Sequence, residues 1–215
     1  MNTKYYMSIP WFYTWSDQVF HKIMQDTVKG FDLRPIQSEA STLKERATLV
    51  VSSMKSTSEP YILFSVSDVI VNSGFSSEIS EMKSDIIFVD APKHMAQTSL
   101  MLLKNTSDVL EFWTSLSTSD VTFEESISNF KGTSSKFPPK CLTTDTWDKR
   151  SDFKILVLIS NGYGKEFDFA EKIFRMAQYV DFQEYMQYVP EDVVPFIYKI
   201  QELLFLTHKE MKKSS

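Results

Sequence analysis

The carboxylate of Asp68 is the first candidate for chemistry in this sequence, because it stands late in the most apolar run. Residues 61–71 read Tyr-Ile-Leu-Phe-Ser-Val-Ser-Asp-Val-Ile-Val, with Ser65, Ser67 and Asp68 set toward the far end. A near-continuous apolar run bearing one carboxylate is typical of a central parallel strand that delivers a residue to a site. A buried carboxylate must be hydrogen-bonded, paired or metal-bound, since isolated burial of its charge is costly. An Asp that caps or shapes a turn is the open alternative.

Several common catalytic motifs are missing from the sequence. There is no P-loop, no Gly-x-Gly-x-x-Gly stretch and no Gly-x-Ser-x-Gly elbow. Their absence weakens a nucleotide triphosphatase, a dinucleotide oxidoreductase and a serine hydrolase as interpretations. His21, His94 and His208 lie far apart without ligand spacing, so none is assigned to a metal. The single Cys141 cannot form an internal disulfide, and nothing demands an oxidising compartment.

The composition is that of a globular protein with long regular elements. Apolar residues make up 42% of the 215 residues, with only 5 Gly and 8 Pro, so a substantial core is expected. A net charge of −5 argues against a sequence-independent nucleic-acid binder, which normally carries a basic face. No stretch approaches the roughly 18 apolar residues of a membrane span. The N-terminus also lacks a signal-peptide core, so we expect a soluble, cytoplasmic protein, in the host cytoplasm if a virus encodes it.

Strand and helix patterns alternate along the chain. The capping pattern at 41–45 precedes an apolar run at 47–54, and the stripe that contains Val19 and Ile23 predicts an earlier helix. Ser107 and Asp108 are expected to cap another helix, and 132–140 is expected to be a loop. Strands are predicted at 4–10, 31–36, 61–71, 84–89, 99–103 and 154–160, and helices at 19–28, 42–54, 107–116, 123–130, 167–180 and 191–208.

This alternation predicts an α/β fold with a mainly parallel central sheet and helices on both faces. No internal repeat or composition shift marks a second domain, so residues 1–215 are expected to form a single domain. Residues 191–215 supply a C-terminal helix and a frayed basic tail, with packing against the sheet or a neighbour. In such folds the ligand crevice lies outside the carboxyl ends of the strands.

The order of these segments resembles the nucleotide-diphospho-sugar transferases with the A-type glycosyltransferase fold, including small glycosyltransferases encoded by large algal viruses. The strand that carries Asp68 is followed by a strand opening at Asp85, the segment 97–105, and a helix containing Phe112-Trp113. Glu124-Glu125 matches an Asp-Gln pair that begins a family helix, and Ile159-Ser160-Asn161 matches a late His-Ala-Asn type segment. The resemblance spans residues 4–180.

The resemblance implies a donor site for a nucleoside-diphosphate sugar and a divalent metal, Mn²⁺ or Mg²⁺. Asp68 would be the anchor of the metal, which neutralises charge on the departing diphosphate, and Ser67 beside it would belong to the donor-binding site. The base would lie near Ser8, Ile9, Pro10 and Tyr13. Lys44, Arg46 and Lys165 would face the diphosphate, and backbone amides at Asn161 and Gly162 would approach it. A solvated surface position is the alternative for each of these cations.

An inverting transfer would also need a carboxylate that deprotonates the acceptor hydroxyl. Glu124, Glu125, Asp85 and Asp90 are the candidates, and the sequence does not rank them.

We therefore expect a metal-assisted glycosyltransferase that acts on a glycan or a glycoprotein. The alternative is a weakened nucleotide-sugar-binding or protein-interaction domain, because Val66 and Ile159 occupy places where the family has ligands. The short length predicts that acceptor recognition comes from a further domain or another protein. Donor sugar, acceptor and stereochemistry stay open.

Overall fold

The structure is a computed structural model. It describes residues 5–11, 15, 18–19, 22–23, 26, 31–37, 40, 42–66, 69–71, 81–91, 97–138, 142–143, 155–157, 170 and 182–213. For the strands at 5–11 and 31–37 the description concerns the backbone.

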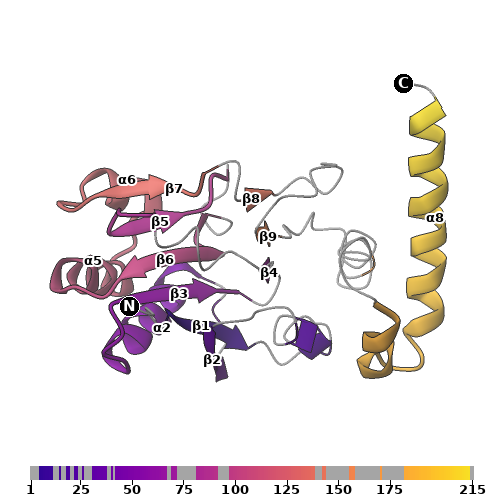
Figure 1. Cartoon of the computed structure of the whole chain (residues 1–215), viewed down its shortest axis with the longest axis horizontal. Helices are drawn as coiled ribbons and strands as arrows, with labels where there is room; N and C mark the ends of the chain where they lie inside the picture. The colour runs from indigo at the N-terminus through magenta and orange to yellow at the C-terminus, as the bar shows by residue number, and fades with distance from the viewer. Residues whose placement is uncertain are drawn as a thin grey trace.

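A six-stranded mixed sheet forms the centre of the fold (Figure 1). Its order is β2 (Phe31–Gln37), β1 (Tyr5–Trp11), β3 (Tyr61–Ser65), β6 (Leu100–Lys104), β5 (Ile86–Phe88) and β7 (Ser134–Lys136). The pairs β1–β2, β1–β3 and β5–β7 are parallel, whereas β6 runs antiparallel to both of its neighbours. The predicted α/β class is confirmed, and the reversal of β6 makes the sheet mixed.

Three helices cover one face of this sheet through a shared apolar core. They are α2 (Leu43–Lys55), α5 (Ser107–Thr118) and α6 (Phe123–Ser128). Trp113 and Phe123 are fully buried there, and the ring of Phe123 meets that of Phe88 edge-on at 5.2 Å. On the opposite face Leu63 and Leu102 are also fully buried, so both faces of the sheet are covered. The predicted helix at 167–180 lies outside the described residues apart from the helical Ala170.

Local hydrogen bonds start two of the helices. Thr42 and Glu45 form a reciprocal capping box at α2, with N···O distances of 2.9 and 3.2 Å, which confirms the predicted start. The predicted cap of α5 is wrong. Its N-cap is Thr106 and makes no side-chain cap bond. Ser107 and Asp108 already lie inside the first turn, where the Asp108 charge complements the helix dipole.

A second sheet has three strands in the order β4 (Val69–Val71), β9 (Ile155–Val157) and β8 (Leu142–Thr143). The single strand predicted over 61–71 is therefore wrong, because β3 and β4 belong to different sheets. The polar positions interrupt the run: the Ser65 hydroxyl donates to its neighbour's carbonyl, and the Val66 N–H donates to the Ser99 carbonyl at 2.8 Å. The loop predicted over 132–140 is also wrong in part, because Ser134–Lys136 form strand β7.

The N-terminal helical residues show the predicted amphipathic pattern. Val19 and Ile23 are fully buried, while Lys22 and Asp26 form an exposed i,i+4 ion pair at 3.0 Å. The Tyr185 hydroxyl, in the 3₁₀ helix η1 (Phe182–Tyr188), donates to Asp26 at 3.1 Å. The last helix, α8 (Val194–Lys213), stands away from the central sheet (Figure 1). Neither α8 nor any other helix in the described ranges combines the length and apolar content of a membrane span.

Candidate functional site

The carboxyl ends of β3 and β5 meet the start of β6 at one edge of the central sheet. Ser65 pairs with Leu100, and Phe88 pairs with Met101. Because β6 is antiparallel, the segment just before it also lies at this edge. Gln97, Thr98 and Ser99 belong to that segment, and all three are buried polar residues.

Arg46 supplies a buried cation at this edge. It lies in the first turns of α2, only 5% of it is exposed, and its Nη1 donates to the Thr98 hydroxyl at 2.8 Å. The next residue, Ser99, accepts the N–H of Val66. Asp68 follows Val66 by two residues in the sequence and lies outside the described residues. A fixed positive charge is therefore bound to the strand end that leads to Asp68.

Glu124 is a carboxylate at the same edge. It lies on α6, and its Oε1 accepts a hydrogen bond from the Gln97 side-chain amide at 2.9 Å. The Gln97 carbonyl in turn accepts the Val89 N–H at 3.1 Å, which fixes Gln97 to the end of β5. The Oε1 atom of Gln97 is buried and accepts no hydrogen bond within the described part of the chain.

Glu125, the neighbouring candidate, has a different environment. Its Oε2 accepts hydrogen bonds from the Thr122 N–H at 3.0 Å and the Thr122 hydroxyl at 2.9 Å. The Thr122 hydroxyl oxygen accepts the Glu125 N–H at 3.2 Å, which completes a capping box. These bonds give Glu125 a structural task at the start of α6.

Asp85 lies at the opposite edge of the sheet, before the first residue of β5. Its Oδ2 accepts the Thr133 N–H and the Thr133 hydroxyl, both at 2.8 Å, and Lys104 Nζ lies 3.2 Å from Oδ1. The Thr133 backbone bond, then the Thr133 hydroxyl and Lys104, lower the pKa of Asp85 below its ordinary value. The fold does not bring this carboxylate together with Arg46 and Glu124.

Two further predicted residues are exposed. Asp90 follows the carboxyl end of β5 and pairs with Lys136 at 2.7 Å, and more than half of each side chain is exposed. Lys44 Nζ lies 3.8 Å from Asp120, with about half of the lysine side chain exposed. Salt screens such pairs, so they fix little geometry.

The predicted base-binding segment is placed through its backbone. Ser8 pairs with Phe64 of β3 and with Arg34 of β2, so residues 8–10 lie at the carboxyl end of β1 beside β3. The described residues contain no group of three or more His, Cys, Asp or Glu side chains that could hold a metal. The remaining predicted site residues lie outside the described residues: Tyr13, Ser67, Asp68, Asn161, Gly162 and Lys165.

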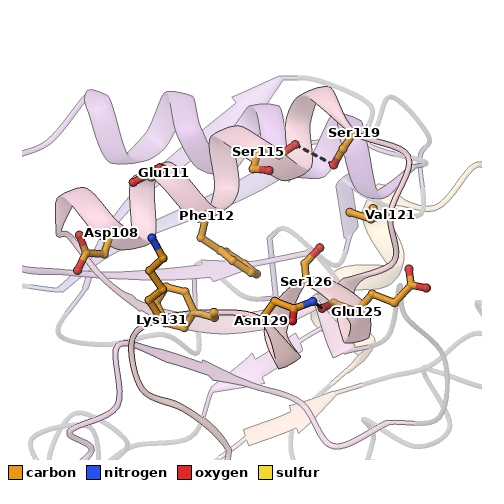
Figure 2. A pocket seen from close by; sticks show the side chains of 11 residues that line it. Asp108, Glu111, Phe112, Ser115, Ser119, Val121, Glu125, Ser126, Asn129 and Lys131 are labelled. Carbon is orange, nitrogen blue, oxygen red and sulfur yellow. Dashed lines mark hydrogen bonds between the residues drawn. The ribbon is translucent and has the colours of Figure 1, made fainter.

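A groove of about 480 Å³ runs between α5 and α6, away from the sheet (Figure 2). The ring of Phe112 lies in it, and the carboxylates of Asp108, Glu111 and Glu125 line it together with Lys131. Because carboxylates outnumber the ammonium group, the groove disfavours a diphosphate. A second cavity of about 400 Å³ lies beside β5 and β7.

Gln97 and Thr98 were missed as site residues by sequence reasoning. The available signal was a Gln-Thr-Ser run directly before the apolar segment 100–103. Polar residues that precede a strand lie at the carboxyl ends of the neighbouring strands only if that strand is antiparallel to them. The reversal of β6 is therefore what brings them to the site.

Comparison with known proteins identifies a shared fold. No family model and no curated protein matches the chain. A solved structure of a glycosyltransferase involved in the glycosylation of the major capsid of PBCV-1 has a TM-score of 0.57 and 14% identity, covering 81% of this chain and 99% of that one. TarS residues 1–349 from S. aureus has a TM-score of 0.39 and 10% identity, covering 88% and 82%. The first likeness shows that the two chains share a fold.

Proposed function

We propose that this chain is a glycosyltransferase that moves a sugar from a nucleoside-diphosphate sugar to a glycan or glycoprotein acceptor. The observation that carries the proposal is the buried Arg46, bonded to Thr98 at the carboxyl edge beside the strand end that leads to Asp68. A fixed cation at that edge suits a leaving diphosphate. The fold shared with the PBCV-1 capsid glycosyltransferase supports the same activity.

Asp68 is the proposed anchor for a divalent cation, Mn²⁺ or Mg²⁺. Hard cations of this kind accept one or two protein carboxylates when substrate phosphates and waters complete the coordination. When bound, the metal would neutralise charge that develops on the leaving diphosphate.

Glu124 is the proposed general base of an inverting transfer. Its carboxylate would take the proton of the acceptor hydroxyl while that oxygen bonds to the anomeric carbon. The bond from the anomeric carbon to the diphosphate breaks, and its electron pair leaves with the diphosphate. The Gln97 amide, 2.9 Å from Oε1, would hold the carboxylate in position for this step. The β1 end at residues 8–10 would hold the base of the nucleotide.

The test is release of nucleoside diphosphate by the purified chain, measured with a panel of uridine and guanosine diphosphate sugars and Mn²⁺. We expect one donor to be turned over and the Asp68→Ala variant to lose metal-dependent binding with unchanged far-ultraviolet circular dichroism. Lys55→Met controls for a change of charge away from the site: Lys55 is an exposed cation in the last turn of α2, so this variant should keep donor binding and turnover.

Two outcomes would contradict the proposal. If no nucleotide sugar of the panel releases nucleoside diphosphate and calorimetry detects no donor binding, the proposed donor site is wrong. Tight donor binding without release or transfer, in the presence of candidate acceptors, would favour a binding module in place of an enzyme.

A further inference from the structure

The exposed large apolar side chains of the described residues gather on α8. Phe196 is 44% exposed, Leu203 55% and Leu206 48%, and Tyr198 and Phe205 are similarly exposed. Single exposed apolar residues are ordinary on a protein surface, but a contiguous group marks an interaction site.

Helical spacing orders these residues into a stripe. Phe196 and Leu203 are seven residues apart, which is about two turns and places them on one side of the helix, and Leu206 follows three residues later. We name Phe196, Leu203 and Leu206 the α8 stripe. Ile197 and Ile200 are buried, and Ile200 stands one turn from both Phe196 and Leu203. The helix therefore packs on its own chain along the side that borders the stripe, while the three side chains of the stripe are exposed. Figure 1 shows the helix projecting from the rest of the fold.

The charges at the two ends of α8 have opposite signs. Exposed Glu191 and Asp192 precede the helix, whereas Lys209, Lys212 and Lys213 stand in its last turns. An antiparallel pair of such helices places the basic end of one beside the acidic start of the other. The helix dipoles of an antiparallel pair also attract each other.

A second copy of the chain fits these features better than a lipid surface. A helix that lies on an anionic bilayer normally carries Lys or Arg along its polar face. Here Glu202 and Glu210 share α8 with the lysines, and the whole chain carries a net charge of −5, which opposes approach to anionic lipid.

We propose that α8 is a dimerisation helix, and that two copies of the chain pair antiparallel through the α8 stripe. The two-fold axis passes near Leu203, close to the middle of the helix, so that the same patch serves both copies. This interface is independent of the proposed transferase activity.

The test is the mass of the full chain in solution, measured by light scattering and sedimentation over a concentration series. We expect twice 24.9 kDa for the wild type. Leu203→Glu should raise the dissociation constant about a hundredfold, because pairing would bury two unpaired carboxylates. Val121→Glu is the matched control: Val121 is 44% exposed on the α5–α6 connection, and its change should leave the mass unaltered.

A charge exchange tests the antiparallel arrangement without touching the stripe. Replacing Glu191 and Asp192 by Lys should weaken the dimer, and adding Lys212→Glu and Lys213→Glu to that variant should restore it. Circular dichroism checks that α8 stays helical in each variant. A monomer at every concentration, a Leu203→Glu dimer of wild-type strength, or cosedimentation of a monomer with phosphatidylserine vesicles would overturn the proposal.

Discussion

Arg46 and Thr98 are joined by a buried hydrogen bond of 2.8 Å although they stand 52 residues apart in the sequence. The bond ties the first turns of α2 to the segment that precedes β6. The next residue, Ser99, accepts the Val66 N–H. The two hydrogen bonds together hold the end of β3 beside the buried guanidinium of Arg46.

Arg46→Met should weaken binding of a nucleoside diphosphate at least about tenfold, since it removes the buried charge while keeping most of the side-chain volume. Arg46→Lys should recover part of the affinity, because the charge returns without the planar fork. Calorimetric titration with the diphosphate measures both variants. An affinity equal to that of the wild type in Arg46→Met would remove this residue from the donor site.

The adjacent glutamates Glu124 and Glu125 should respond differently to the same substitution. Glu124→Gln should lower turnover by about 10²- to 10⁴-fold with donor affinity retained, as expected for loss of a general base. Glu125→Gln should keep both turnover and stability, because Gln also completes a capping box with Thr122. Steady-state kinetics separates them. A loss of turnover in Glu125→Gln but not in Glu124→Gln would show that Glu125 is the general base.

Asp85 should contribute stability that acid removes. Its folded-state pKa lies below the ordinary 3.8, so the unfolded chain binds the proton more tightly. The contribution is therefore present above about pH 4 and is lost as the pH falls through the folded-state pKa. Asp85→Asn should cost about 1–3 kcal/mol near neutral pH. Thermal unfolding at a series of pH values should show the two proteins converging in acid, and a constant difference would contradict this account.

Gly132→Ala should destabilise the fold. A Cβ at this position would lie 2.6 Å from the ring of Phe130 and 2.9 Å from Asp85 Oδ2, so the ring and the carboxylate must both move. We expect a loss of about 1–3 kcal/mol in the free energy of unfolding. Lys131→Ala, at an exposed neighbour, should change it by less than about 0.5 kcal/mol. Urea denaturation measures the free energy of unfolding of both variants. Equal stabilities would contradict the predicted clash of the added Cβ with Phe130 and Asp85.

The Tyr185 hydroxyl should stabilise the attachment of η1 to the N-terminal helix. Burial and the hydrogen bond to Asp26 raise the pKa of Tyr185 from 10.0 to about 12. Its contribution is therefore present below pH 10 and is lost between pH 10 and about 12, as the unfolded chain gives up the proton first. Tyr185→Phe should cost about 1 kcal/mol at neutral pH. Tyr188→Phe, at a 46% exposed position, should cost almost nothing by the same thermal measurement.

The part of the fold that the sequence predicted rests on short-range interactions. The capping box of Thr42 and Glu45, and the burial of Val19 and Ile23 four residues apart, each depend on groups within one helical turn. The apolar runs at 61–71 and 99–103 predicted buried strands in the same way, and the buried strands β3 and β6 lie within or overlap these runs. The α/β class followed from their alternation with helices.

The candidate site was decided by tertiary structure. Two glutamates stand side by side in the sequence. Only the tertiary structure joins Glu124 to Gln97 at the carboxyl edge, while Glu125 completes the helix cap. Asp85 was predicted to open a strand, but β5 begins one residue later, and the direction of β5 sets Asp85 at the far edge with Thr133. Strand direction and the pairing of distant segments depend on long-range packing. No residue type or spacing in the sequence records that packing, so the sequence determined the elements and the tertiary structure decided which side chains meet.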